Sequence, residues 1–138
     1  MNAKAQALGM NDTRFIDPTG LSSSNVSTAQ DLARMVRAAH EYPLIRQYST
    51  RDSATVESLG RKLGYRNTNG LVRSAQWDIG LSKTGYISEA GRCLVMRVRM
   101  ASREVIVVLL DSWGKQSRIG DAQRIRKYLE THPVARSM

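Results

Sequence analysis

Residues 77–110 decide the fold of this chain, and they read WDIGLSKTGYISEAGRCLVMRVRMASREVIVVLL. In residues 96–100 three apolar side chains alternate with two arginines, which is the period-two pattern of a strand with one apolar and one solvated face. A valine-rich apolar run follows from Glu104 to Leu110 and is typical of a buried strand. The pattern predicts an antiparallel hairpin, which becomes a three-stranded meander if the segment around Lys83 is also extended.

Two helices are predicted around this sheet. The first begins after Thr28 as its cap, has an acid at Asp31 in its first turn, and is stopped by Pro43 soon after His40. Its apolar stripe consists of Leu32, Met35, Val36 and Ala39. The closing helix is expected to begin at Asp121 as its cap and to end at Pro133. Its apolar face consists of Ala122, Ile125 and Leu129.

Weaker patterns fill the rest of the chain. Residues 3–8 are good helix formers, and Gly9 is suited to a left-handed C-terminal cap, so this segment reads as the end of a helix. Residues 48–63 indicate short extended segments with a turn at 60–64. The single cysteine, Cys93, is followed by Leu94 and Val95, which indicates a buried thiol acting as a small apolar residue.

Lys83, Thr84 and Gly85 are the candidate binding residues. They place an ammonium group, a hydroxyl and a backbone without a side chain in succession on a segment expected to be extended. This combination suits an extended acyl chain that ends in a carboxylate, because the cation and the hydroxyl can both donate to the carboxylate oxygens. The glycine leaves room for the ligand's backbone to lie against the strand.

Composition limits the alternatives. The chain has 138 residues, of which 41% are hydrophobic and 24% charged, enough for one ordinary domain. Its net charge of +9 favours anionic surroundings such as nucleic acid, phospholipid head groups or an acidic wall polymer. A nucleic-acid-binding module is a weaker alternative, because the predicted helix at residues 28–40 offers only Arg34 and Arg37 and aromatic residues are few.

Other functional classes find little support in the sequence. His40, His132 and Cys93 share no metal-ligand spacing, so no metal site is expected. No apolar run approaches the roughly 20 residues of a transmembrane helix.

With its surroundings, the Lys-Thr-Gly triplet resembles the third motif of low-molecular-mass penicillin-binding proteins, the D-alanyl-D-alanine carboxypeptidases and endopeptidases. The resemblance rests on GLSKTGY at residues 80–86 and AGRCLV at residues 90–95. Three further segments agree with that family in order. They are ALGMNDTRFIDPTGL at residues 7–21, STAQDLA at 27–33 and NTNGL at 67–71. The likeness therefore spans nearly the whole chain.

The resemblance implies an α/β (α+β) fold of the penicillin-binding-protein and β-lactamase type, an antiparallel sheet flanked by helices, whose N-terminal part would precede these residues. Residues 1–138 would then be the C-terminal part of a single D,D-peptidase catalytic domain. Residues 1–70 would be a helical segment, and residues 71–138 would hold the Lys-Thr-Gly strand, the hairpin and the closing helix.

The implied activity is that of a serine-type D-alanyl-D-alanine peptidase of the bacterial periplasm, which cleaves peptidoglycan stem peptides, binds β-lactams and needs no cofactor. Lys83 and Thr84 would hold the terminal carboxylate, and Gly85 would admit the substrate backbone. Because the chain stops soon after the closing helix, it resembles the endopeptidase branch more than the carboxypeptidase branch.

The nucleophile is not expected among these residues. Ser112 to Lys115 fit the S-x-x-K pattern but follow the Lys-Thr-Gly strand and contain Gly114, and residues 23–25 fit S-x-N but lie in a loop that follows the family's second motif. The catalytic serine and its lysine are therefore expected upstream. A non-catalytic peptidoglycan-binding or complementing chain is the alternative, and the missing N-terminal portion or self-association is expected to cover the open sheet edge.

Overall fold

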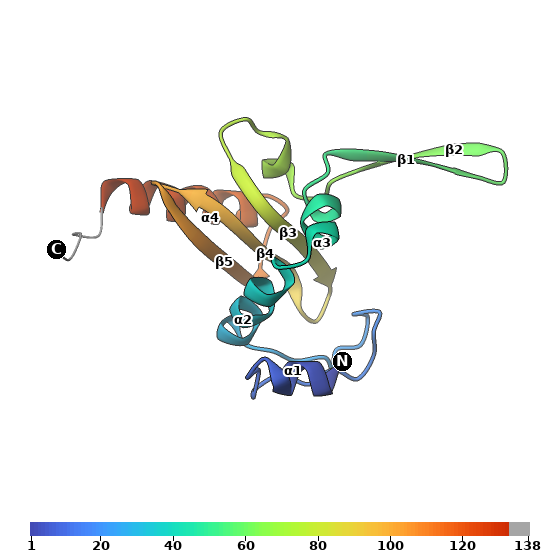
Figure 1. Cartoon of the computed structure of the whole chain (residues 1–138), viewed down its shortest axis with the longest axis horizontal. Helices are drawn as coiled ribbons and strands as arrows, with labels where there is room; N and C mark the ends of the chain where they lie inside the picture. The colour runs from blue at the N-terminus through green and yellow to red at the C-terminus, as the bar shows by residue number, and fades with distance from the viewer. Residues whose placement is uncertain (133–138) are drawn as a thin grey trace.

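The computed structural model describes residues 1–132, and a three-stranded antiparallel sheet forms its centre (Figure 1). The strands are β3 (Asp78–Ile87), β4 (Gly91–Met100) and β5 (Arg103–Ser112). They follow the order β3-β4-β5, so β4 is central and the predicted meander is confirmed. The strands are joined by tight turns, and Ala101 and Ser102 both adopt positive φ between β4 and β5.

Helices cover both faces of this sheet. On one face lies α4 (Ser117–Thr131), whose Ala122 is packed against Leu94, Met96 and Val98 of β4. On the other face lies α2 (Ala29–Ala39), whose Val36 is packed against Leu81 and Val95. The expectation of one solvated face is therefore wrong beside α2 and holds only toward the end of β4, where Arg99 is exposed. The difference arises because a strand's own alternation does not reveal which helix packs against its second face.

The predicted first helix is confirmed, and one helix was missed. Thr28 caps α2 by accepting a 3.2 Å hydrogen bond from the Asp31 N–H, and the helix ends at Ala39. Pro43 does not merely stop it but begins α3 (Pro43–Ser49), which is consistent with the suitability of proline for the first helical position. The N-terminal helix α1 (Asn2–Ala7) is also confirmed, with Gly9 at a φ of 71°.

The closing helix begins earlier than predicted. It starts at Ser117, and Asp121 lies inside it, paired with Arg124 one turn later. The prediction was wrong because residues 117–120 lack an apolar pattern. The Ser117 hydroxyl accepts a 2.8 Å hydrogen bond from the Gly114 N–H ahead of the helix. Pro133, the expected terminator, lies outside the described residues.

A separate β-hairpin precedes the sheet. It consists of β1 (Ser53–Ser58) and β2 (Arg61–Arg66), and a short 3-10 helix, η1 (Gly70–Arg73), leads from it toward β3. The two-residue turn is Leu59-Gly60, both at positive φ, and not the predicted 60–64. Figure 1 shows the hairpin as an arm that leaves the body beside α3. In the part of the chain described here, no helix is long and apolar enough to cross a membrane.

Candidate functional site

Lys83, Thr84 and Gly85 lie in the middle of β3, which is an edge strand among residues 1–132. Lys83 is exposed, and its ammonium group donates to the Thr84 carbonyl. Lys83 lies opposite Val95 and Thr84 opposite Leu94, so their side chains leave the strand on opposite faces of the sheet. Both nevertheless border the same open edge.

The backbone of Thr84 faces this open edge. Two residues earlier, the Ser82 N–H donates to the Ser49 hydroxyl of α3 at 3.3 Å rather than to β4. Because outward and inward backbone groups alternate along an edge strand, the Thr84 N–H and C=O face outward as well. An extended ligand chain could therefore pair with β3 at this position.

The segment before η1 fixes the strand in place. The buried Asn69 side chain donates to the Ser82 hydroxyl at 2.9 Å and accepts from the Leu71 N–H at 3.1 Å. Next to it, the Thr68 and Thr84 hydroxyls lie 2.5 Å apart. The asparagine side chain closes this turn on its own backbone, a common use of asparagine before a short helix. The NTNGL segment thus positions the strand and adds a hydroxyl beside Thr84.

Gly85 and Gly80 differ in what surrounds them. A Cβ at Gly85 would meet no atom within 4 Å, so no internal contact demands a glycine there and the space beside the strand is open. A Cβ at Gly80 would lie 3.0 Å from the His40 ring, and the β3 register shifts between Ile79 and Leu81. The strand irregularity therefore belongs to Gly80, while Gly85 keeps the edge accessible.

A cationic pocket of about 200 Å³ adjoins Thr84. Its lining includes Thr68 and Thr84 on one side and Arg73, Lys115 and Arg118 around them, with no acidic residue in the lining. The N-terminal turn of α4 contributes Arg118, whose guanidinium also donates to the Cys93 carbonyl at 2.7 Å. Three positive charges and two hydroxyls make this a pocket for an anion, and a carboxylate is the simplest ligand that fits.

The cationic lining was missed by sequence reasoning. Arg73, Lys115 and Arg118 come from η1, the turn after β5 and α4, and each looks like one more scattered basic residue in the sequence. In the sequence, Lys115 stands out only as the last residue of the S-x-x-K match. No local signal could have revealed the cluster, because only the packing of α4 against the sheet brings these segments together.

Other sequence expectations can be compared with the structure. Cys93 is half-buried rather than buried, with its thiol 3.5 Å from the Ala90 carbonyl oxygen, because it lies near the turn at the start of β4. Ser112 ends β5 and Lys115 lies in the turn before α4, and within residues 1–132 no hydrogen bond joins them. Asn25 of the S-x-N match accepts from the Ile16 and Asp17 N–H groups and so has a structural role in its loop. No cluster of three metal-ligating side chains occurs in the described part of the chain.

His40 connects α2 to the sheet behind the site. Its Nδ1 accepts a 2.7 Å hydrogen bond from Arg97 of β4, and its ring lies against Gly80. Burial, followed by the positive charges of Arg97 and Arg46, lowers the pKa of His40 below its ordinary value of 6.5. The ring is therefore neutral at pH 7 and acts as a packing and hydrogen-bonding group.

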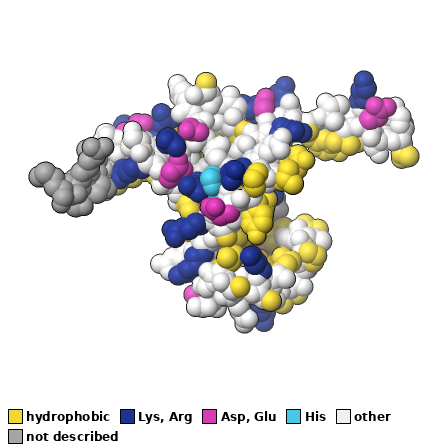
Figure 2. Space-filling view, in the orientation of Figure 1, with side chains coloured by type: hydrophobic (Ala, Val, Ile, Leu, Met, Phe, Trp, Pro, Cys, Tyr) yellow, Lys and Arg dark blue, Asp and Glu magenta, His cyan; other side chains and the backbone are white. Residues whose placement is uncertain are grey.

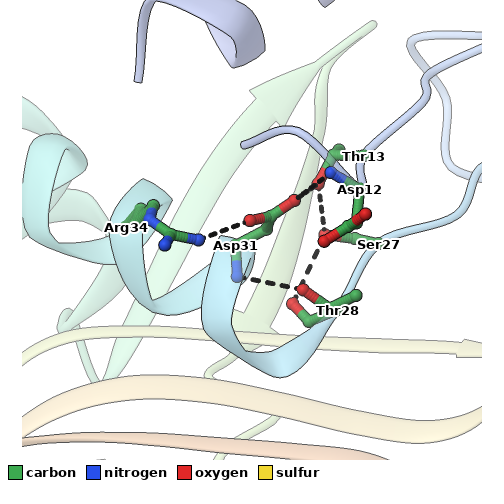
Figure 3. A network of polar contacts seen from close by, with 6 residues as sticks. All are labelled: Asp12, Thr13, Ser27, Thr28, Asp31 and Arg34. Carbon is green, nitrogen blue, oxygen red and sulfur yellow. Dashed lines mark hydrogen bonds and ion pairs between the residues drawn. The ribbon is translucent and has the colours of Figure 1, made fainter. Parts of the chain in front are cut away.

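A second polar network fixes the N-terminal segment to α2 (Figure 3). The buried Asp31 carboxylate accepts from the Asp12 N–H at 2.9 Å, the Thr13 hydroxyl at 2.7 Å and the Arg34 guanidinium at 2.7 Å. Burial raises the pKa of the Asp31 carboxyl, but the hydrogen bonds from Thr13, Asp12 and Arg34 outweigh it, and the pKa lies below the ordinary 3.8. This acid therefore serves architecture rather than catalysis.

Comparison with known proteins places these features in a family. The family model described as D-alanyl-D-alanine carboxypeptidase matches residues 1–114. A D-alanyl-D-alanine endopeptidase of Pseudomonas aeruginosa is 50% identical over 136 residues, covering 97% of this chain and 44% of the relative. A D-alanyl-D-alanine endopeptidase of Escherichia coli is 49% identical with the same coverage. The chain thus spans less than half the length of these curated relatives.

Solved structures agree with the sequence comparison. The Streptomyces K15 DD-transpeptidase superimposes with a TM-score of 0.82 at 29% identity, covering 92% of this chain and 51% of that one. Penicillin-binding protein D2 of Listeria monocytogenes, solved with cefotaxime bound, gives a TM-score of 0.77 at 26% identity, covering 91% of this chain and 51% of that one. The mixed α/β arrangement expected from the sequence is therefore confirmed.

Proposed function

The chain belongs to the D-alanyl-D-alanine carboxypeptidase family of serine peptidases, and from this premise we propose that it supplies the carboxylate-binding half of a D-alanyl-D-alanine peptidase site. Its ligands would be the D-alanyl stem peptides of peptidoglycan and the β-lactams that resemble them. Residues 1–138 would be the C-terminal part of one catalytic domain. The names of the two relatives near 50% identity favour the endopeptidase reaction over the carboxypeptidase reaction.

One observation carries the proposal: Thr84, whose backbone faces the free edge of the Lys-Thr-Gly strand, also lines the cationic pocket. A peptide that pairs with the outward-facing backbone of Thr84 would pass Gly85, where the space beside the strand is empty. Its terminal carboxylate would then reach the Thr84 hydroxyl and the cations of the pocket, among which Arg118 can donate two parallel hydrogen bonds. The exposed Lys83 ammonium adds positive charge from the other face of the strand.

The same edge has a second chemical use. The outward-facing N–H of Thr84 can donate to the oxygen of a carbonyl under attack, which is the role of one half of an oxyanion hole. The attacking serine would have to come from a segment other than those gathered at this site, because Ser112 and Lys115 lack the geometry of a nucleophile and its base. We therefore propose binding by this chain and no acyl-enzyme formation by it alone, in the bacterial periplasm where peptidoglycan lies.

A non-catalytic peptidoglycan-binding chain remains the second candidate, since the pocket and the open edge would serve binding without any nucleophile. The two candidate functions, part of a peptidase domain and a non-catalytic binding chain, predict different effects of adding an N-terminal segment that carries the nucleophile. Supplied in trans, such a segment should restore cleavage only if the chain is part of a peptidase domain.

The experiment combines penicillin labelling with peptide binding. Incubation with a fluorescent penicillin, followed by denaturing electrophoresis and intact mass, is expected to show no covalent adduct. Titration of a D-Ala-D-Ala peptide, followed by NMR, is expected to show weak binding that Lys83→Ala and Arg118→Ala each reduce about tenfold. Lys62→Ala, an exposed lysine on the distant hairpin, is the matched control and should bind normally.

Two results would contradict the proposal. A stoichiometric penicillin adduct at Ser112 would show that a nucleophile does lie in this chain. Peptide binding that is unchanged in both Lys83→Ala and Arg118→Ala would show that the cationic pocket and the Lys-Thr-Gly strand do not form the ligand site.

A further inference from the structure

The β1–β2 hairpin has an apolar side that nothing covers within residues 1–132. Its two strands pair only with each other and do not join the central sheet. A two-stranded hairpin is marginally stable in water unless one face is packed against something. Figure 1 shows the hairpin leaving the body as an arm, so the cover has to come from outside the described structure.

The strand register separates the hairpin into two unlike faces. Val56 lies opposite Leu63, and Ala54 opposite Tyr65, which places these side chains on one face. The intervening pairs carry polar, charged or no side chains on the other face. They are Ser53 with Arg66, Thr55 with Gly64 and Glu57 with Lys62. The hairpin is thus amphipathic, with an alternation that is the usual sign of a strand with one buried face.

Next to the turn the same face carries Ser58 opposite Arg61, and further apolar side chains are exposed at both ends of the hairpin. At the tip, the Leu59 side chain is fully exposed, and Val56, Leu63 and Tyr65 are each 44–57% exposed. These four residues are called the hairpin stripe below. Near the base, Leu44 and Tyr48 of α3 are also more than half exposed. Figure 2 shows hydrophobic side chains along the underside of the arm and on the adjoining part of the body.

The charge around the stripe is positive. The hairpin strands carry Arg61, Lys62 and Arg66 against the single acid Glu57, and the whole chain has a net charge of +9. Two copies of such a surface repel each other, whereas an anionic surface attracts it. Charge complementarity therefore disfavours self-association through the hairpin and favours a negatively charged partner.

The shape of the stripe is convex. Neither the cationic pocket at Thr84 nor a second pocket lined by Gln76, Trp77 and Arg126 has a hairpin residue in its lining, and Leu59 projects at the end of a two-stranded arm. A projecting apolar tip flanked by cations and a tyrosine matches the elements that enter the boundary between lipid head groups and acyl chains. The cationic side chains are long enough to reach the phosphates while the apolar stripe sits deeper.

From these observations we propose that the β1–β2 hairpin docks on an anionic phospholipid surface, inserting the hairpin stripe at the interface while its arginines and lysine contact the lipid phosphates. The interaction is peripheral and reversible, because only a few apolar side chains enter the bilayer. It would hold the Lys-Thr-Gly site at a membrane surface, yet it does not depend on the function proposed for that site.

Vesicle flotation with the full chain tests the proposal. We expect binding to vesicles of phosphatidylglycerol and phosphatidylethanolamine, and little binding to pure phosphatidylcholine. Leu59→Asp combined with Leu63→Asp should weaken binding about tenfold or more, because a charge replaces two inserted leucines. Arg61→Glu with Lys62→Glu should also weaken it and should reduce its salt dependence. Leu21→Asp is the matched control, since Leu21 is 73% exposed but far from the hairpin in sequence.

A second readout covers the case in which the aspartate variants fail to fold. Leu59→Trp keeps the hairpin apolar and places a fluorescent reporter at its tip. The tryptophan emission of this variant, after subtraction of the wild-type emission, should shift to the blue when anionic vesicles are added. Unchanged binding in the hairpin variants, an absent blue shift, or loss of binding in Leu21→Asp as well would overturn the proposal. The proposal would also be overturned if sedimentation showed a dimer that the Leu59 and Leu63 variants no longer form, since a second copy of the chain would then cover the hairpin stripe.

Discussion

The Asn69 side-chain amide donates a 2.9 Å hydrogen bond to the Ser82 hydroxyl, and both residues are buried beside the Lys-Thr-Gly strand. The same asparagine accepts from the Leu71 N–H, so one side chain joins the turn before η1 to the residue that precedes Lys83. The position of the Lys-Thr-Gly strand therefore depends on a buried side chain outside the triplet.

Asn69→Ala should destabilise the chain by about 2–4 kcal/mol, because it leaves the buried Ser82 hydroxyl and the Leu71 N–H without their partner and opens a small cavity. Urea denaturation followed by circular dichroism would measure this. Asn11→Ala is the control, since Asn11 is exposed, and it should change stability by less than about 0.5 kcal/mol. Equal effects from the two substitutions would refute the role given to Asn69.

Gly80→Ala and Gly85→Ala should behave differently although both lie in β3. The first places a Cβ 3.0 Å from the His40 ring, which Arg97 holds in place, and should cost about 1–2 kcal/mol. The second meets no atom within 4 Å and should leave stability nearly unchanged while weakening peptide binding along the edge. Thermal melts and the peptide titration together separate the two effects, and a destabilised Gly85→Ala variant would count against an open edge.

Stability should fall as the pH drops below about 6.5, in part through His40. Its pKa is lowered in the folded chain by burial and by Arg97 and Arg46, so the unfolded state binds a proton at a higher pH than the folded state does. The folded chain is therefore at its most stable, as far as His40 is concerned, above the unfolded pKa of 6.5. This part of the stability declines as the pH falls from 6.5 toward the lowered pKa of the folded state. The urea concentration at the unfolding midpoint, measured between pH 5 and 8, should depend less steeply on pH in His40→Gln than in the wild type. An unchanged slope in His40→Gln would show that this ring does not contribute to the pH dependence.

Asp31→Asn should lower the thermal midpoint at pH 7 by about 5 °C or more, because an amide cannot accept the three hydrogen bonds that the carboxylate receives. The folded pKa of Asp31 is lowered, so its stabilisation is present above the unfolded value of 3.8 and is lost as the pH falls through the lower folded value. The difference in thermal midpoint between the wild type and Asp31→Asn should therefore become smaller below pH 4. Asp12→Asn is the control, since Asp12 uses only its backbone N–H in this network.

The local elements were largely predictable from the sequence. The alternation in residues 96–100 and the valine-rich run after it predicted β4 and β5, because a strand exposes alternate side chains to alternate faces whatever surrounds it. The Thr28 cap and the stripe with Val36 predicted α2 for the same reason, since the helical period is a property of the backbone. The Lys-Thr-Gly triplet and the ordered segments around it also indicated the family, which the comparisons confirm.

Contacts between distant segments were decided by the tertiary structure alone. The second face of the sheet is covered because α2 packs against Leu81 and Val95. The cationic pocket exists because Arg73, Lys115 and Arg118 are brought beside Thr84 by three separate segments, namely η1, the turn after β5, and α4. Gly80 is required by the His40 ring, which lies forty residues earlier in the chain. Periodicity is a local property that the sequence states directly, whereas these contacts depend on how the helices and loops close around the sheet, and no single stretch of residues encodes that closure.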